Sequence, residues 1–392
     1  MLAQRLKLIR LARGLSLEEL VTKAGNVVTK QALSKYEMGS AQPSPRVLAA
    51  IASALQIKAI DLLNEPVHTI DCVAYRKKSK LGQKAMNAVE STLKLALEER
   101  TWLTALVQEK TERLPAHEFK VSKPEDVELA AESLREKWRL GMEPIANLTD
   151  VIENHGVHVV VITADDGFHG LSACAKSKEG DVVAAAVATN AVSAGERLRS
   201  NLAHELGHIV IKPTGMDEKA EERAALRFSS AFQAPRCLVF RDVGRRRSSV
   251  TLDELRIWKK RWKLSMQAIV YRLRDLDVIS DSHCKAWFIQ FSRLGWRKSE
   301  PDQLSPEKPQ WLKRSVLHAF AEKLITKDRA EAILGESVQG QLPSTLQQRR
   351  ALMSLPVETR RKILHEQAER SAKLYQGQSD ELGGDDIREY NV

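Results

Sequence analysis

The sequence contains few cysteines, and none of them forms a closely spaced pair. Its 392 residues include four, which lie far apart in the chain: Cys72, Cys174, Cys237 and Cys284. Disulfide scaffolds and cysteine zinc clusters need dense or closely spaced cysteines, so this pattern argues against both. The pattern fits a protein of the reducing cytoplasm.

Long hydrophobic runs are also missing. No apolar stretch approaches the roughly 18 residues that a membrane helix requires. The N-terminal segment MLAQRLKLIRLARGLS has basic residues scattered through it and lacks the apolar core of a signal peptide. Internal repeats are absent as well. We therefore expect a cytoplasmic protein with no membrane partner.

The charge balance is basic. Lys+Arg total 61 against 51 for Asp+Glu, which gives a net charge of +10. This excess favours an anionic partner without identifying one. Hydrophobic residues make up 43% and charged residues 29%, which is ordinary for a soluble globular protein. At roughly 100–200 residues per domain, the length allows two to four domains.

Residues 1–65 are dense in short helical patterns and predict an all-α unit of five short helices. Ser16 and Glu19 predict a capping box at the start of the second helix. The second and third helices, 16–23 and 29–38, have helix-turn-helix spacing. Spacing alone leaves open an ordinary helical bundle with a solvated polar face. In a helix-turn-helix, side chains near the start of the second helix of the pair meet base edges, and the candidates are Thr29, Lys30, Gln31, Ser34 and Lys35.

This N-terminal region resembles the Cro/cI-type repressor domain from end to end. The resemblance is carried by MLAQRLKLIRLARGLSLEEL, TKQALSKYEMGSAQPS and VLAAIASAL. It implies that residues 1–65 bind operator DNA. It also implies a homodimer on a near-palindromic site, because such domains usually act in pairs.

The pattern changes after the N-terminal region. One long helix is predicted over about 81–107, and a capping box of Ser122 and Glu125 predicts the start of another. Pro144 is expected to begin a further helix, which Gly156 ends. Three strands are then predicted, in the segments VHVVVIT, FHGLSAC and DVVAAAVAT, because they are rich in β-branched and small apolar residues.

An HExxH motif lies in a segment that is predicted to be helical, residues 195–211. His204 and His208 are four residues apart, so both imidazoles lie on one helical face and can reach a single ion. Glu205 lies beside them and is positioned to take a proton from water at the metal. The motif occurs by chance often enough that it needs further context.

A catalytic zinc needs a third protein ligand and an open position. The next predicted helix supplies several carboxylates. Glu222 shares a face with Ala225 and Phe228, which are expected to pack inward, whereas Glu221 points about 100° away. Periodicity therefore favours Glu222 as the third ligand. The alternative is that these glutamates form only a solvated face.

The segments ERLRSNLAHELGH and EERAALRFSSAFQAP resemble zinc metallopeptidases of the ImmA/IrrE type, over about residues 125–300. In that family the glutamate at position 222 is the third zinc ligand. The resemblance thus implies zinc bound by His204, His208 and Glu222, with Glu205 as catalytic base. Further matching positions are Arg197, Arg199, Ala203, Ala225, Phe228, Pro235 and the GLS of 170–172. The chain departs from the family pattern beside the site, at Ser200, Leu226 and Ser229.

The C-terminal region predicts one amphipathic helix, over about 357–375, followed by an acidic tail. The simpler interpretation is a solvated helix. The alternative is a segment that folds on a small toxin-like partner. The acidic residues of the tail are Asp380, Glu381, Asp385, Asp386 and Glu389.

These patterns together predict an α+β protein, with an all-α helix-turn-helix domain and a mostly helical zincin-like domain that contains a small β-sheet. The expected parts are the DNA-binding domain 1–65, a helical connector 66–120, the metallopeptidase domain 121–300, a helical extension 301–345 and a C-terminal helix with acidic tail 346–392.

The predicted function is a transcriptional regulator fused to a zinc endopeptidase. The expected substrate is a regulatory protein, a repressor or an antitoxin, cleaved in a stress, phage-defence or toxin-antitoxin response. One alternative is a non-catalytic DNA-binding regulator that uses the peptidase fold as a sensor. Another is an antitoxin-like regulator whose tail binds a small toxin.

Overall fold

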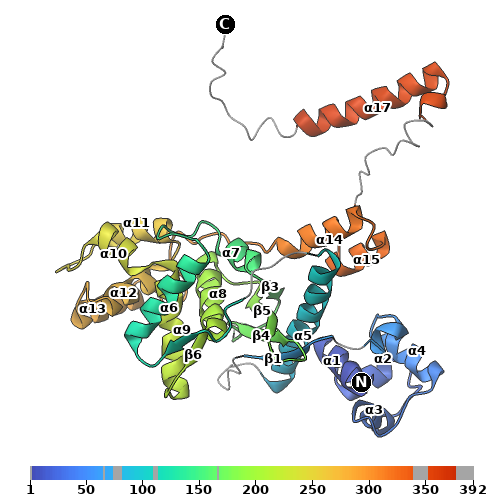
Figure 1. Ribbon diagram of the computed structural model, residues 1–392, viewed down its shortest axis with the longest axis horizontal. Coiled ribbons are helices and arrows are strands. Elements are labelled where there is room, and N and C mark those ends of the chain that lie inside the picture. Colours follow the sequence, from blue (N-terminus) through green and yellow to red (C-terminus); the bar gives the residue numbers. More distant parts are fainter. Residues whose placement is uncertain are drawn as a thin grey trace. The chain divides into compact units, whose positions relative to one another are not determined.

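The computed structural model describes residues 2–64, 67–73, 82–108, 114–165, 167–338 and 352–376. The chain divides into two compact units, Met1–Thr326 and Lys327–Val392. The first unit contains many helices and a small mixed sheet, which confirms the predicted α+β class (Figure 1). Within the described residues, no helix combines the length and the apolar character needed to cross a membrane.

The N-terminal domain has the predicted short helical elements. Ser16 and Glu19 form the expected capping box, and the Thr29 side chain accepts a hydrogen bond from the Ala32 amide. A small apolar core that includes Leu6 and Leu33, both fully buried, holds the elements together. They are α1 (Leu2–Ala12), α2 (Leu17–Lys23), α3 (Lys30–Glu37), α4 (Pro45–Ala54) and the 3-10 helix η1 (Ala59–Leu62).

The long helix α5 (Gln83–Leu106) lies between the N-terminal domain and the sheet (Figure 1). On one face, Glu98 pairs with Arg5 of α1, and the Thr92 hydroxyl donates to the Ala12 carbonyl over 3.3 Å. A different face packs against the sheet through Val89, Leu93 and Leu97. The N-terminal domain and the sheet are therefore attached to two faces of the same helix.

The main sheet has four strands in the order β1-β4-β5-β3. The sequence predicted three of them, β3 (Val157–Ile162), β4 (Leu171–Lys176) and β5 (Val182–Asn190). β4 is antiparallel to β1 and β5, and β3 is parallel to β5. The short strands were not predicted; they are β1 (Thr69–Cys72), β2 (Phe119–Val121) and β6 (Ile211–Pro213), of which the last two form a separate pair.

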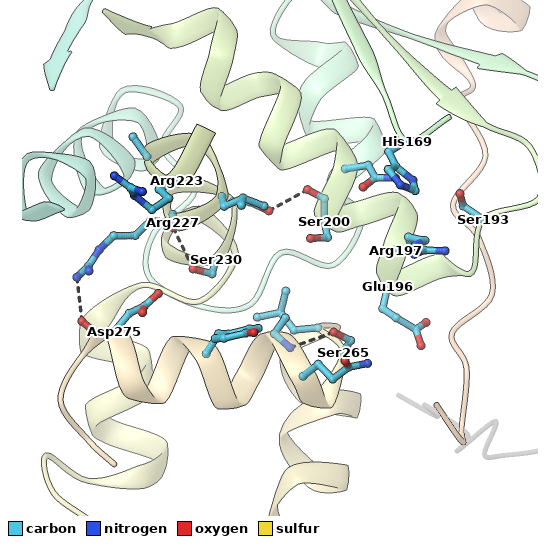
Figure 2. A pocket seen from close by; sticks show the side chains of 18 of the residues that line it. His169, Ser193, Glu196, Arg197, Ser200, Arg223, Arg227, Ser230, Ser265 and Asp275 are labelled. Atoms are coloured by element: carbon cyan, nitrogen blue, oxygen red, sulfur yellow. Dashed lines mark hydrogen bonds between the residues drawn. The ribbon is translucent and has the colours of Figure 1, made fainter. Parts of the chain in front are cut away.

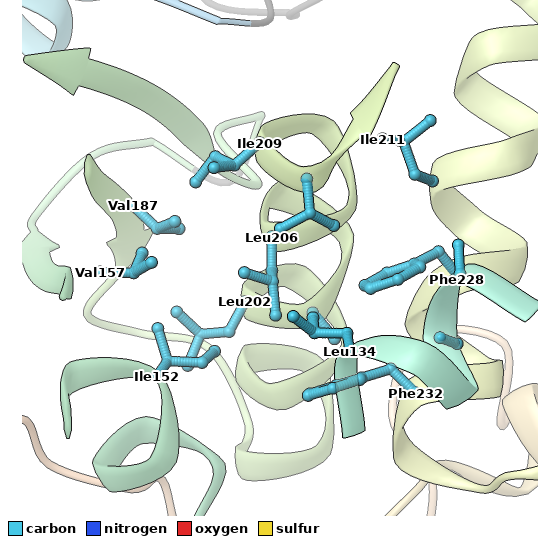
Figure 3. Close-up of a cluster of buried hydrophobic side chains, with 14 of the residues drawn as sticks. Leu134, Ile152, Val157, Val187, Leu202, Leu206, Ile209, Ile211, Phe228 and Phe232 are labelled. Carbon is cyan, nitrogen blue, oxygen red and sulfur yellow. The ribbon is translucent and has the colours of Figure 1, made fainter. Parts of the chain in front are cut away.

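The helices opposite α5 build the largest apolar core, and they carry the HExxH motif. Leu202, Leu206 and Ile209 of α8 belong to this core together with Phe228 and Phe232 of α9. Ile209 lies on the side of α8 that faces Val187, and the two phenylalanines lie on the other side (Figure 3). Strands β3 and β5 and the helices α6 and α7 complete it. The bounds of the helices are α6 (Pro124–Lys137), α7 (Leu148–Asn154), α8 (Gly195–Val210) and α9 (Glu218–Gln233).

The predicted capping box of Ser122 and Glu125 is wrong by one residue. Asp126 is the carboxylate that closes the start of α6, because it is three residues beyond the cap at Lys123. It accepts hydrogen bonds from the Ser122 amide and hydroxyl, both at 2.9 Å, and from the Lys123 amide at 3.1 Å. These hydrogen bonds lower the pKa of Asp126, and the bond from the Ser122 backbone amide has the largest effect.

The prediction that Pro144 begins a helix is also wrong. α7 begins at Leu148, directly after Asn147, whose side chain accepts from the Asp150 amide over 3.1 Å. A side-chain acceptor satisfies an amide at the helix start, which proline cannot do. The residues from Pro144 to Asn147 form a connection instead.

A second apolar core, which contains several tryptophans, follows α8 and α9 in the chain. It is formed by α10 (Arg236–Val243), α11 (Leu252–Trp262), α12 (Met266–Asp275) and α13 (Asp281–Arg293). The chain then runs back towards α8 through residues 294–310, the return segment, and enters α14 (Trp311–Ala321). In the return segment the Leu304 carbonyl accepts from the Gly195 amide at the start of α8 over 2.9 Å.

The second unit contains α15 (Lys327–Leu334) and α17 (Val357–Gln376). The latter confirms the helix predicted over about 357–375. The acidic residues from Asp380 to Glu389 lie outside the described residues.

Candidate metal centre and DNA-binding surface

The structure brings three candidate ligands together, two from α8 and one from α9. The Nε2 atoms of His204 and His208 are 3.1 Å apart. The Glu222 carboxylate lies 3.5 Å from His204 Nε2 through Oε1 and 3.4 Å from His208 Nε2 through Oε2. These residues form the one group of metal-capable side chains found within the described part of the chain, and Glu221 does not belong to it.

The donor set fits zinc. An ion with four tetrahedral bonds of about 2.0–2.1 Å holds its ligand atoms roughly 3.3–3.4 Å apart. The three separations here span 3.1–3.5 Å. Two imidazoles and one carboxylate are a known catalytic zinc set that leaves a fourth position open. His204 is buried, whereas the Glu222 side chain is 41% exposed, so the centre is reached from the Glu222 side.

Glu205 lies in a buried position, 2% exposed, beneath the start of β4. The Ser172 hydroxyl donates to Glu205 Oε2 over 3.0 Å. The backbone of Gly170 approaches the same side chain so closely that a Cβ there would lie 2.8 Å from Oε1 and 2.9 Å from Cγ. A glycine is therefore required at 170, and together with Ser172 it fixes the position of the Glu205 carboxylate.

The sequence alone does not reveal that Gly170 and Ser172 position Glu205. The alternation of side chains along the strand could have indicated the role of Ser172, because successive residues of a strand face opposite sides of a sheet. Leu171 and Ala173 face α5. Ser172 must then face the HExxH helix on the other side.

Small side chains allow α8 and α9 to pack closely enough to share a ligand site. A Cβ at Gly207 would lie 3.0 Å from Cδ1 of Phe228, so glycine permits the contact. The Ser229 hydroxyl donates to the Ser200 carbonyl over 2.9 Å and links the two helices directly. Two of the positions that depart from the family pattern, Ser200 and Ser229, thus bond to each other across the helix pair.

The candidate DNA-contacting residues lie together around the start of α3. Thr29, Lys30, Gln31 and Lys35 are exposed, and Ser34 is partly exposed. Lys30 pairs with Glu18 of α2, a bond that a phosphate could replace because both side chains are more than half exposed. The buried residue Leu33 anchors the opposite face of α3. The arrangement leaves the polar face of α3 accessible.

Comparison with protein families agrees with both resemblances. Residues 6–62 match the family model described as helix-turn-helix, and residues 153–274 match the one described as an IrrE N-terminal-like domain, a peptidase family. The chain joins a helix-turn-helix domain to an IrrE-like domain. No curated protein and no solved structure matches it significantly. The IrrE-like match includes all four candidate residues of the metal centre, His204, Glu205, His208 and Glu222.

The two arginines before the motif have different surroundings in the IrrE-like domain. Arg199 is 1% exposed, pairs with Glu307 of the return segment and donates to the Ile145 carbonyl over 3.0 Å. Glu307 also accepts from the amide and hydroxyl of Thr149. Arg199 therefore ties α8 to its surroundings. Arg197, by contrast, is exposed and faces a cleft beside α8 and α9, the two helices that carry the candidate metal ligands (Figure 2).

Proposed function

We propose that the protein is a DNA-binding regulator whose IrrE-like domain is a zinc endopeptidase. The single observation that carries this proposal is the convergence of His204, His208 and Glu222 at zinc-ligand separations, with Glu205 beside them. The proposed substrate is another regulatory protein, a repressor or an antitoxin, cleaved in a stress or defence response.

The proposed reaction is hydrolysis of a peptide bond. His204, His208 and Glu222 would hold the zinc. Bound zinc supplies Lewis acidity and lowers the pKa of water. Glu205 accepts the proton from the attacking water and later delivers it to the leaving amine. Ser172 restricts rotation of the Glu205 carboxylate through its hydrogen bond to Oε2.

Metal analysis tests the ligand set. Purified protein is expected to contain about one zinc per chain, because three protein ligands define one site. His204→Ala and His208→Ala should each lose the zinc, and Glu222→Ala should weaken its binding. Glu221→Ala is the matched control and should keep full occupancy by atomic emission. Full occupancy in Glu222→Ala together with loss in Glu221→Ala would contradict the assignment.

Footprinting on the DNA upstream of the protein's own gene tests the N-terminal domain. Lys30→Ala and Lys35→Ala should weaken binding, and Gln31→Ala should relax base preference more than it lowers affinity. Binding should fall steeply with salt, because phosphate contacts release counterions.

Lys58→Ala serves as the control for the footprint, because this exposed lysine lies outside α3. It should bind as the unchanged protein does. A protein that leaves this DNA unprotected at low salt would show that the N-terminal domain is a module for protein interaction instead.

A further inference from the structure

A cleft of about 990 Å³ runs beside the metal helices. Figure 2 shows Arg197 on α8, Arg223 and Arg227 on α9, and Ser265 at the start of α12 around it. The return segment supplies another part of the wall, which includes Arg297, and the start of α6 a further part, which includes Lys123. Apolar side chains also line the cleft, among them Phe168, Met216, Leu226, Leu264 and Tyr271.

The acidic groups in the wall of the cleft already have basic partners. Glu196 and Glu300 both bind the buried ammonium of Lys259, at 2.8 and 3.0 Å. Glu300 also accepts hydrogen bonds from two backbone amides at the start of α12. Asp275 pairs with Arg274 at 2.6 Å. Each of these carboxylates is therefore already paired, and the cluster of Glu196, Glu300 and Lys259 keeps one net negative charge.

Five basic side chains in the cleft wall have no carboxylate partner. Each is exposed, and no ion pair joins any of them to another residue within the described ranges of the chain. They come from four separate parts of the chain, so the positive charge surrounds the cleft instead of following a single helix face. The five are Lys123, Arg197, Arg223, Arg297 and Lys298.

Two of these arginines lie a short distance from the metal centre. Arg223 directly follows Glu222 on α9, so its side chain leaves the helix about 100° away from that ligand, and it lines the cleft. Arg197 precedes His204 by two helical turns, about 10 Å at 1.5 Å per residue. An extended peptide covers that distance in about three residues at roughly 3.3 Å each.

We infer that this cleft selects peptide substrates with acidic side chains about three residues from the bond that is cut. The inference rests on the proposed peptidase function and specifies its substrate class. Arg197 binds this acidic side chain, because a guanidinium matches the geometry of a carboxylate with two parallel hydrogen bonds. Arg223 lies on the other side of the cleft and adds to its positive charge (Figure 2). The apolar part of the wall accommodates neighbouring side chains, which favours a peptide over a nucleic acid backbone.

Fluorescence anisotropy with defined peptides tests the inference without requiring turnover. The probes are two fluorescein-labelled ten-residue pools of Ala and Leu, one with Asp and Glu at varied positions and one with Asn and Gln instead. The protein is the zinc-loaded, full-length Glu205→Gln variant. It should bind the acidic pool at least about tenfold more tightly than the amide pool, and this preference should decrease as salt rises.

Charge reversal locates the binding. Arg197→Glu/Arg223→Glu should abolish the preference for the acidic pool. Lys285→Glu/Arg293→Glu changes the net charge equally at exposed α13 positions outside the cleft, and it should leave the preference intact. If the first double variant loses zinc, the preference for the acidic pool is measured in the single variant Arg197→Glu, because Arg197 lies two helical turns from the ligands.

Three outcomes would overturn the inference. The two pools could bind equally well, or both double variants could lose the preference for the acidic pool to the same extent. Single-stranded dT10 could also displace the labelled peptide as effectively as unlabelled acidic peptide does. The last would assign the cleft to nucleic acid. Cleavage of both pools by the unmutated protein is measured in parallel. Preferential binding of the acidic pool without any cleavage would contradict the proposed peptidase function and support the assignment of the cleft. Cleavage without a preference for acidic peptides would support the peptidase function and contradict the assignment of the cleft.

Discussion

Replacing Glu205 by glutamine is expected to lower peptide cleavage by about 10²- to 10⁴-fold, the usual loss when a general base is removed. Glutamine keeps the size of the side chain and can still accept a hydrogen bond from Ser172. The three metal ligands are unchanged. Zinc content and operator binding should therefore equal those of the unchanged protein, while cleavage and the resulting derepression disappear.

The measurement belongs in cells that carry a reporter of the regulated promoter, under DNA damage and under phage challenge. A Glu205→Gln strain that still represses but no longer responds would identify proteolysis as the switch. Glu221→Gln provides the matched control, because it removes a carboxylate outside the ligand group. An unchanged response of the Glu205→Gln strain to every challenge would instead favour a non-catalytic sensor.

Replacing Lys259 by methionine is expected to lower the free energy of unfolding of the first unit by about 3–5 kcal/mol. Lys259 is fully buried and binds Glu196 and Glu300. Methionine fills a similar volume but leaves two carboxylates in the interior without a counter-charge. Urea denaturation, followed by tryptophan fluorescence, measures the loss.

Lys260→Met is the control, because the neighbouring lysine is exposed. It should change stability by less than about 0.5 kcal/mol. Adding Glu196→Gln and Glu300→Gln to Lys259→Met should recover part of the loss, since both uncompensated charges are then removed. A Lys259→Met protein as stable as the Lys260→Met protein would contradict the assigned role of the buried ion cluster.

The caps and side-chain groupings that could be predicted from the sequence depend on short spacings. His204 and His208 are one helical turn apart, so their common face follows from helix geometry alone. Glu222 follows from the periodicity of α9, whose buried side includes Ala225 and Phe228. Ser16 could be assigned as a cap because its partner Glu19 is three residues away.

The features that the sequence did not reveal depend on residues far apart in the chain. Arg199 and Glu307 are separated by 108 positions, and Lys259 and Glu196 by 63. No local pattern indicates which distant carboxylate a buried cation will meet. The short strand β1 has only four residues, and its pairing with β4 stabilises it more than its own composition does.

The placement of α5 has a consequence for how the two proposed activities, DNA binding and peptide cleavage, depend on each other. One face of α5 carries the N-terminal domain, and another packs on β4, the strand that holds Glu205 through Ser172. A displacement of α5 on DNA binding would therefore be transmitted to Glu205, the proposed catalytic base, through two layers of close packing. The two binding equilibria would then be linked. If bound DNA changes the affinity of the protein for a peptide by some factor, the bound peptide changes the affinity for the DNA by the same factor.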